Sequence, residues 1–541
     1  MTNVAPQRIL PASDRVLLVE YDSLDAVLGH FAALDVAGLV GVTELIPAAD
    51  TIMVHYDPLR TTPEELAQRI REVPALRHIE HNLETMTIDV VYAGEDLEEV
   101  AKSLHVGVDE LIRRHTGATW SGAFAGFAPG FVYCVGDDPL FDVPRRSSPR
   151  ARIPAGSVAV ASNFSAVYPR ESPGGWQLLG RTAQPMWDLE RETPAAVQPG
   201  QQVQYRAVRD TAILTQHEPM ASGLRPVPDD TPYLEVVKTG AQMLVQDTGR
   251  PGHTGLGVSA SGAADRRALH RANRAVGNDR NVGALEIAGG GAELLSNVRT
   301  VVVLTGATSS ANIVSADDEV LPLRHSEPTA IEAGDSIHIG ALTDGIRTYL
   351  AVRGGFKLPP ILTSLATDTL SGIGPTPLTT GDRLPIGDKA CVHAVQPLLG
   401  PVHSPDNYEK DATPQSARSA EPCQLRVVLG PRTDWFTEQA IEDLTGQDWT
   451  VTPNSDRVGL RLQGEFPLDR AITRELPSEG AVTGAIQVPP DGQPVLFMPD
   501  HPLTAGYPII GAVIDEDLDL AGQLAPGMNL RFRIVRQFTE F

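Results

Sequence analysis

Arginines, glycines and aromatic residues gather in one short segment of the chain, Tyr168 to Thr182, which reads YPRESPGGWQLLGRT. Two prolines and three glycines make this run unsuited to a helix, so it predicts a loop that shapes either a turn or a ligand site. Its two arginines, Arg170 and Arg181, carry planar groups of paired donors, the geometry that carboxylate and phosphate groups match. The segment is therefore a candidate for recognising an anionic substrate.

Five further segments combine glycine and proline with charged or aromatic residues, which is more than a plain strand needs. Glycine lets a backbone approach a ligand closely, and proline holds the shape of a loop. These segments are GFAPGFVY (126–133), PRRSSPRARIPAGSVAVAS (144–162), VQDTGRPGHTGLGVSASGAAD (245–265), NSDRVGLRLQG (454–464) and SEGAVTGAIQVPPDGQPVLFMPDHPLTAGYP (478–508). Phe127, in the first of them, is a candidate for substrate contact.

The first half of the chain offers a histidine and two arginines for catalysis. His115 suits acid–base work, although a histidine near a helix C-terminus is favourable without any catalytic role. Arg150 and Arg181 are candidates for stabilising developing negative charge, and ion pairs with surface carboxylates are the alternative. Tyr168 and Trp176 are candidates for stacking on a flat substrate, and packing in the core is the alternative for both.

In the second half, one group of candidates follows a predicted strand. Gln246, Asp247 and Arg250 lie among glycines, where side chains and backbone would meet a ligand together. We expect Asp247 and Arg250 to be catalytic and Gln246 to bind substrate. Asp265 is interpreted as the cap of the helix that follows it.

A second group lies nearer the C-terminus. Glu479 is a candidate base, and Gln487 and Asp500 are candidates for substrate binding or for holding Mg²⁺. Arg457 is a further candidate for substrate binding, and an ion pair with Asp456 is its alternative role.

Composition excludes several functional classes. The 541 residues include 44 Lys and Arg against 68 Asp and Glu, a formal net charge of −24. Such an acidic chain repels phosphate backbones and anionic membranes, so we expect neither nucleic acid nor a membrane as partner. We find no signal peptide and no run of about 18 apolar residues. Three separated cysteines without CxxC spacing favour a cytoplasmic location and predict no metal centre.

Sequence periodicity predicts a mainly β protein with α+β parts. Strands at RVLLVEY, DTIMVHYD and TMTIDVVYA alternate with two capped helices, which is typical of a small ferredoxin-like domain. Beyond Thr119, short β-branched pieces between glycines and prolines favour β-barrels or sandwiches. The expected parts are a small α+β domain (14–92), a β domain (93–215), a linker (216–232), a β-rich part (233–397), an exposed loop (398–422) and a second β-rich part (423–541).

Several standard motifs are absent from the sequence. There is no GxxxxGK[ST] phosphate loop, GxSxG elbow or HExxH zinc motif, and no amidase nucleophile segment or biotinyl-lysine motif. The chain is therefore not a hydrolase of a standard type.

The longer motifs resemble a known pair of families. RRHTG, GFAPGFVY, PRARIPAGSVAVAS and YPRESPGGWQLLGRT resemble the family of the 5-oxoprolinase B subunit, also called allophanate hydrolase subunit 1 or Kip inhibitor-like. VQDTGRPGHTGLGVSASGAAD, LHRANRAVGN, GPRTDWF, SDRVGLRLQG and SEGAVTGAIQVPPDGQPV resemble the family of the 5-oxoprolinase C subunit, also called allophanate hydrolase subunit 2 or Kip antagonist-like. The chain resembles the two subunits fused, and MPDHPLTAGYP departs from the usual family pattern.

The resemblance implies cyclophilin-like β-barrels and favours His115, Arg150 and Arg181 as functional residues. It also implies an ATP-dependent 5-oxoprolinase that uses ATP and Mg²⁺, acts on a small amide and needs a separate protein like the A subunit of that enzyme, of the LamB/YcsF type. The first alternative is a biotin-dependent carboxyltransferase for urea or a related amide, with biotin on another chain. The second is an inhibitor of a histidine kinase, which fusion to an antagonist disfavours. Homo-oligomerisation is left open.

Overall fold

The computed structural model describes residues 5–76, 85–146, 148, 150–209, 224, 226–387, 393–396 and 421–541. Strands dominate and helices are few, which confirms the predicted mainly β fold with α+β parts. The predicted exposed loop (398–422) lies outside these residues except for 421 and 422, and the predicted linker (216–232) lies outside them except for 224 and 226–232. Within them, no helix combines the length and the apolar character needed to cross a bilayer.

The small N-terminal domain has a four-stranded sheet in the order β1-β2-β4-β3. Its helices begin at the predicted caps: Ser23 accepts a hydrogen bond from the Ala26 amide, and Thr62 forms a capping box with Glu65. The elements are β1 (Arg8–Ser13), β2 (Val16–Glu20), α1 (Leu24–Ala37), β3 (Val42–Pro47), β4 (Thr51–Tyr56) and α2 (Pro63–Glu72).

The predicted range of this domain, 14–92, differs from the structure at both ends. TMTIDVVYA contains β5 (Met86–Val90), which pairs in parallel with β13 (Gln202–Ala207) of the next domain. The edge position beside β2 is filled instead by β1, which begins at Arg8. Alternating apolar residues identify a strand without naming its partner, so the sequence alone did not assign β5 to the sheet of the first barrel.

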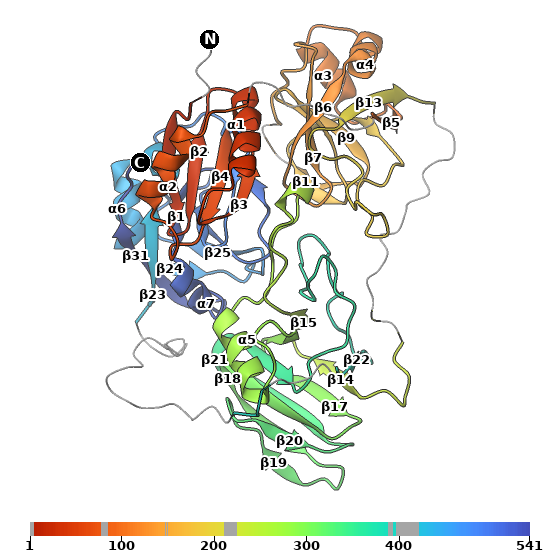
Figure 1. Cartoon of the computed structure of the whole chain (residues 1–541), viewed down its shortest axis with the longest axis vertical. Coiled ribbons are helices and arrows are strands. Elements are labelled where there is room, and N and C mark those ends of the chain that lie inside the picture. The colour runs from red at the N-terminus through yellow and green to blue at the C-terminus, as the bar shows by residue number, and fades with distance from the viewer. Residues whose placement is uncertain are drawn as a thin grey trace.

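The first barrel contains seven strands in the order β12-β9-β10-β7-β6-β13-β5. Two backbone hydrogen bonds between Val91 and Arg181, 2.8 and 2.9 Å from nitrogen to oxygen, join its two outer strands. Helices α3 and α4 lie at its upper end in Figure 1. Besides β5 and β13, the elements are α3 (Leu97–Ser103), α4 (Val108–Gly117), β6 (Trp120–Ala125), β7 (Val132–Gly136), β8 (Arg150–Ile153), β9 (Ser157–Ala161), β10 (Phe164–Val167), β11 (Ser172–Gly174) and β12 (Gln177–Arg181).

The middle domain is a nine-stranded sheet with one long helix, α5 (Arg266–Val276). Asp265 accepts a hydrogen bond from the Ala268 amide, as its interpretation as a helix cap predicted, and Gly277 ends the helix in the left-handed conformation. The other elements are β14 (Tyr233–Thr239), β15 (Gln242–Gln246), η1 (Thr254–Leu256), β16 (Ala284–Ala288), β17 (Ala292–Ser296), β18 (Thr300–Val314), β19 (Val320–Pro322), β20 (Thr329–Ile331), β21 (Ser336–Val352) and β22 (Arg383–Pro385).

The second barrel is closed and has the strand order β23-β30-β27-β28-β25-β24-β31. β26 and β29 form a separate two-stranded sheet, and in the sequence both lie between strands of the barrel. The elements are β23 (Cys423–Leu429), η2 (Thr433–Trp435), α6 (Glu438–Gly446), β24 (Trp449–Val451), β25 (Gly459–Gln463), β26 (Glu479–Gly480), β27 (Ala485–Gln487), β28 (Val495–Phe497), β29 (Thr504–Ala505), β30 (Ile509–Val513), η3 (Asp515–Asp517), α7 (Leu518–Ala521) and β31 (Asn529–Arg536).

The two barrels arrange their strands in the same spatial order, and in each the first strand runs parallel to the last. The agreement extends to side chains. Trp120 Nε1 donates to the His115 carbonyl and Trp449 Nε1 donates to the Leu444 carbonyl, both at 3.0 Å. The barrels are therefore two versions of one topology, which sequence reasoning did not detect.

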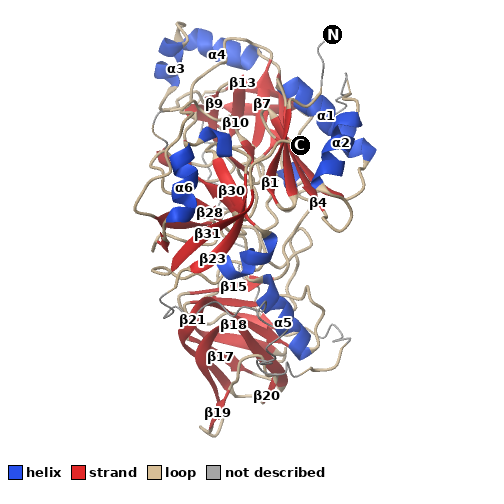
Figure 2. Ribbon diagram, turned by 90° about the vertical axis from the view of Figure 1, so that its left-hand side faces the viewer, coloured by secondary structure: helices blue, strands red, loops and turns tan. Residues whose placement is uncertain are grey.

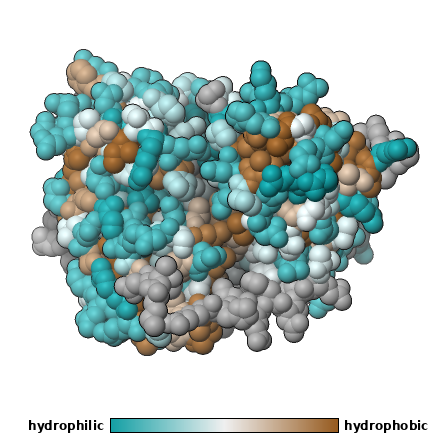
Figure 3. All heavy atoms as spheres, turned by 90° about the horizontal axis from the view of Figure 1, so that it is seen from above, coloured by the Kyte–Doolittle hydropathy of each residue, from teal (hydrophilic) through white to brown (hydrophobic). Residues whose placement is uncertain are grey.

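The chain ends meet in space, because the N-terminal domain packs on the second barrel (Figures 1 and 2). One apolar core contains Leu10 and Leu18 from the first sheet together with Phe497 and Ile509 from the barrel. Seen from above in Figure 3, the surface is mostly hydrophilic with separate apolar patches, as expected for a chain with a net charge of −24.

Candidate functional site

The glycine-rich loop between β6 and β7 joins three domains. The Phe127 amide donates to Thr504 Oγ1 of the second barrel at 2.9 Å, and the Gly130 amide donates to the Leu256 carbonyl of the middle domain at 3.1 Å. An ideal Cβ on Gly126 would lie 2.6 Å from Thr504 Oγ1, so a side chain there would force the domains apart. GFAPGFVY therefore holds the junction together, and substrate contact by the half-buried Phe127 stays a prediction.

Tyr168 and Trp176 lie beneath this loop in an aromatic core. Their exposed fractions are 1% and 6%, and their ring centroids lie 5.3 and 5.4 Å from that of Phe131. Because protein covers both rings, the structure contradicts their predicted stacking on substrate and shows the alternative, core packing.

Arg457 is the centre of a buried ionic network between the middle domain and the second barrel. Its guanidinium donates to Asp500 at 2.9 and 3.0 Å, to Glu286 Oε1 at 2.6 Å and to the Gly262 carbonyl at 2.6 Å. Burial opposes the charge on Arg457, but Asp500 and Glu286 outweigh this effect and raise its pKa. Every nitrogen of the group is engaged, so Arg457 holds the domains together, and its role in substrate binding stays a prediction.

The carboxylate oxygens of Asp500 are likewise fully occupied by hydrogen bonds. Besides those from Arg457, Asp500 accepts hydrogen bonds from Ser261 Oγ at 2.6 Å and from the amide and hydroxyl of Thr369 at 2.8 and 2.7 Å. Burial raises the pKa of Asp500, but Arg457 outweighs burial and lowers it below the usual range. Asp500 is therefore held ionised with its oxygens occupied, and its role in substrate binding stays a prediction.

Asp368 lies beside Asp500 and was missed by sequence reasoning. It accepts hydrogen bonds from the amides of Leu370 and Ser371, both at 2.9 Å, and from Ser259 Oγ at 3.2 Å. Burial raises the pKa of Asp368, and the negative charge of Asp500 raises it further. Two neighbouring carboxyl groups with opposite pKa shifts are typical of acid–base sites. The segment DTLSGIGP carried a usable signal, since it has the glycine, proline and hydroxyl content of the chosen motifs.

Asp247 fixes the turn that leads into the junction. Its carboxylate accepts hydrogen bonds from Ser364 Oγ at 2.6 Å, the Leu365 amide at 2.7 Å and the Gly249 amide at 2.8 Å. These bonds give Asp247 a role in positioning the loop, and its catalytic role stays a prediction.

Gln246 and Arg250 keep unused hydrogen-bonding groups inside the junction. Gln246 Nε2 donates to the Thr367 carbonyl at 2.7 Å, but its buried Oε1 has no partner among the residues described. Arg250 is fully buried and its Nη2 donates to the Ala366 carbonyl, while Nε and Nη1 have no hydrogen-bond partner in the same ranges. Such groups are rare in folded proteins and are candidates for ligand contact.

His115 is buried in the core of the first barrel, an environment that does not suit acid–base catalysis. Its ring nitrogens are hydrogen-bonded to the Tyr92 hydroxyl at 2.7 Å and to Ser165 Oγ at 3.1 Å, and aromatic rings surround it. Burial lowers its pKa to about 3, which keeps the imidazole neutral at physiological pH. These contacts support a packing role for His115, and its catalytic role stays a prediction.

The two arginines favoured in the first half have other roles. Arg150 donates to both oxygens of Asp96, at 2.9 and 2.7 Å, and to Glu95 at 3.2 Å, so it ties β8 to the start of α3. Arg181 closes the barrel through its backbone, and its side chain is exposed. The exposed side chain of Arg181 is not part of the buried junction of loops.

Glu479 lies on β26, which pairs with β29 at Thr504 and Ala505, beside the junction of loops. Its Oε2 accepts two hydrogen bonds from Arg432, at 2.9 and 2.6 Å, where Arg432 also pairs with Glu20 of the N-terminal domain. Burial raises the pKa of Glu479, against the opposing effect of Arg432, and its Oε1 has no partner among the described residues. Gln487 Nε2 donates to the Tyr507 carbonyl at 3.3 Å within the barrel. The base role of Glu479 and the substrate contact of Gln487 stay predictions.

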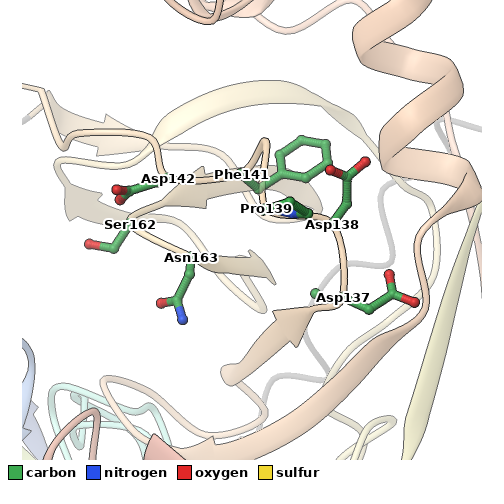
Figure 4. A pocket seen from close by; sticks show the side chains of 8 residues that line it. Asp137, Asp138, Pro139, Phe141, Asp142, Ser162 and Asn163 are labelled. Carbon is green, nitrogen blue, oxygen red and sulfur yellow. The ribbon is translucent and has the colours of Figure 1, made fainter. Parts of the chain in front are cut away.

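A hollow of about 500 Å³ on the first barrel contains none of the predicted site residues. Figure 4 shows its aspartates, Asp137, Asp138 and Asp142, pointing in different directions. Asp138 pairs with Arg114 at 2.6 Å. No group of three His, Cys, Asp or Glu side chains able to hold a metal occurs in the parts of the chain that are described. We therefore derive no step through Mg²⁺, and ATP and biotin stay predictions.

Comparison with known proteins divides the chain into the same two halves. The family model for the carboxyltransferase domain, subdomains C and D, matches residues 7–197, and the model for subdomains A and B matches residues 256–534. A solved structure, that of the protein TTHA0988, superposes with a TM-score of 0.79 at 30% identity, covering 96% of this chain and 99% of that one.

Curated relatives match one half each. The C subunit of 5-oxoprolinase from Escherichia coli (strain K12) is 34% identical over 302 residues, which are 55% of this chain and 90% of that protein. The B subunit of 5-oxoprolinase from Bacillus subtilis (strain 168) is 35% identical over 182 residues, 30% of this chain and 75% of that protein. The urea amidolyase of Saccharomyces cerevisiae is 30% identical over 313 residues, 55% of this chain but only 16% of that enzyme.

Proposed function

Because the chain belongs to the carboxyltransferase-domain family and joins a half similar to the B subunit of 5-oxoprolinase to a half similar to the C subunit, we propose that it is a component of an ATP-dependent 5-oxoprolinase. In this proposal a separate protein of the A-subunit type completes the enzyme, which opens the amide of 5-oxoproline to give glutamate while ATP is hydrolysed. The observation that carries the proposal is the junction itself. Both halves build it, and it contains buried polar groups that the fold leaves unused.

The residues of this chain would act on the amide directly. Opening the ring breaks the C–N bond, adds the oxygen of water to the carbonyl carbon and leaves a nitrogen that takes up a proton. Asp368 is the proposed proton donor, because burial and Asp500 raise its pKa and favour its protonated form. The free donors of Arg250 would stabilise negative charge on the carbonyl oxygen.

The test is reconstitution of the chain with a purified protein of the A-subunit type, ATP, Mg²⁺ and 5-oxoproline. We expect glutamate and ADP to form in equal amounts. Asp368→Asn should lower kcat by about 10²- to 10⁴-fold, the usual effect of removing an acid–base group, without changing the folded state seen by circular dichroism. No glutamate from the folded wild-type chain would contradict the proposal.

A second candidate is carboxyl transfer to urea or a related amide, since the matching family models describe a carboxyltransferase domain and urea amidolyase matches more than half of the chain. Here biotin would come from another protein. Incubation of the chain with carboxybiotin and urea separates the two functions: carboxylated urea supports the second candidate, and its absence together with glutamate formation supports the first.

A further inference from the structure

Arg170 of the first barrel reaches the middle domain next to Asp368. Its Nη1 lies 3.6 Å from the ideal Cβ position of Gly372, in the loop that Asp368 begins. The side chain is half-buried, and its guanidinium makes no hydrogen bond or ion pair with the described parts of the chain. A cation in this position has lost part of its hydration, which the charge of Asp368 offsets only in part and without a hydrogen bond.

Comparison with the second barrel explains why Arg170 has no partner. Arg170 lies three residues after β10, and Asp500 lies three residues after β28, the equivalent strand. Asp500 is neutralised by Arg457, two residues before β25, and the equivalent position before β7 is Gly130. A carboxylate cannot replace this glycine, because its φ is +78° and a Cβ would lie 2.7 Å from the Met186 carbonyl oxygen.

Arg250 also has hydrogen-bond donors without a partner among the described residues. It is fully buried, and Nε and Nη1 find no hydrogen-bond partner among the described residues. Burial lowers the pKa of both Arg170 and Arg250, and the charge of Asp368 acts in the opposite direction on both. Asp247 and Asp500 also act on Arg250, so what Arg250 has in excess is hydrogen-bond donors rather than positive charge.

We propose that Arg170 and Arg250 together bind the carboxylate of the substrate, one arginine from each half of the chain. This inference rests on the proposed function and adds a determinant of specificity to it. Two guanidinium groups offer a carboxylate several charge-assisted hydrogen bonds, which are stronger than those between neutral groups. The site therefore selects an amide that carries a carboxylate over an uncharged amide of similar size.

The test uses calorimetric titration of the purified full chain with 5-oxoproline and with 2-pyrrolidinone, the same ring without the carboxylate. The wild-type chain should bind 5-oxoproline about 10- to 100-fold more tightly, the range expected for charge-assisted hydrogen bonds. Arg170→Gln should abolish this preference and leave the affinity for 2-pyrrolidinone unchanged. Arg170→Lys should restore part of it, and the matched control, Arg181→Gln, should retain all of it.

Three results would overturn the assignment: no binding of either ring by the wild-type chain, a carboxylate preference that survives Arg170→Gln, or equal weakening of both rings by this substitution in a folded chain. A different result would show that the proposed function is wrong while the binding site is right. In that case the carboxylate preference depends on Arg170, but no glutamate forms when the partner of the A-subunit type and ATP are added.

Discussion

The two barrels share one strand order but use the same loop position in opposite ways. After β28 of the second barrel, Asp500 is bonded to Arg457, Ser261 and Thr369, and its charge is neutralised inside the protein. After β10 of the first barrel, Arg170 has no such partner in the described residues. Both side chains approach the loop of the middle domain that begins at Asp368. The saturated position holds the domains together, and the unsaturated one is available to a ligand.

This difference separates structural from functional arginines better than residue type does. Arg150 and Arg457 have well-placed carboxylate partners, so each contributes to the fold. Within the described residues, Arg250 Nε and Nη1 have no hydrogen-bond partner, and no hydrogen bond or ion pair is made by the Arg170 guanidinium. Substitutions should therefore change stability at the first pair of positions and ligand affinity at the second.

The largest effect on stability is expected when Arg457 is substituted. Arg457→Met leaves Asp500 and Glu286 buried without their cation, which should lower the free energy of unfolding by about 3–5 kcal/mol. Urea denaturation measures the loss. The control is Arg461→Gln on the exposed side of β25, which should change stability by less than about 0.5 kcal/mol. Equal effects of the two substitutions would remove the distinction between saturated and exposed arginines.

A smaller effect on stability is expected from a difference between the cores of the two barrels. His115 occupies the position of Leu444 in the second barrel, since each accepts the tryptophan hydrogen bond through its carbonyl. Burial lowers the pKa of His115 to about 3, whereas in the unfolded chain it is about 6.5. Between these values the unfolded state binds an extra proton, so stability is lost as the pH falls.

His115→Leu should remove this dependence. Between pH 6.5 and 5, the wild-type free energy of unfolding should fall by about 1.5 kcal/mol more than that of the variant, from the linkage of one proton. Urea denaturation across this range measures the difference. Parallel pH profiles for the two proteins would show that His115 is protonated in the folded state, contrary to its burial.

The smallest effect is expected at Arg181. Its backbone closes the first barrel while its side chain is exposed, so Arg181→Gln should alter stability by less than about 0.5 kcal/mol and leave turnover unchanged. Reconstituted activity and thermal denaturation check both points. A large loss of activity in a folded variant would return Arg181 to the site and weaken the contrast with Arg170.

Local features of the fold could be predicted from the sequence. The caps at Ser23, Thr62 and Asp265 were recognisable because a cap is bonded to residues only a few positions away. The partner of β5 was not, because that strand pairs with β13, more than a hundred residues further along the chain. The duplicated topology was also hidden, since it consists of strand order rather than repeated residues.

The candidate site was predictable to the same extent. Glycine-rich motifs correctly drew attention to the segments with Arg250, Arg457 and Asp500, which the fold brings to one junction. Residue type could not show that Arg457 is saturated and Arg170 is not, because that depends on carboxylates distant in sequence. Asp368 was missed for the same reason, since its raised pKa results from burial and from Asp500.

A crystal structure of the chain with bound 5-oxoproline would show which side chains bind the substrate carboxylate. We expect this carboxylate to lie within about 3 Å of guanidinium nitrogens of both Arg170 and Arg250, the distance of a charge-assisted hydrogen bond. A substrate bound with its carboxylate on other side chains, with both guanidinium groups left unpaired, would contradict this expectation.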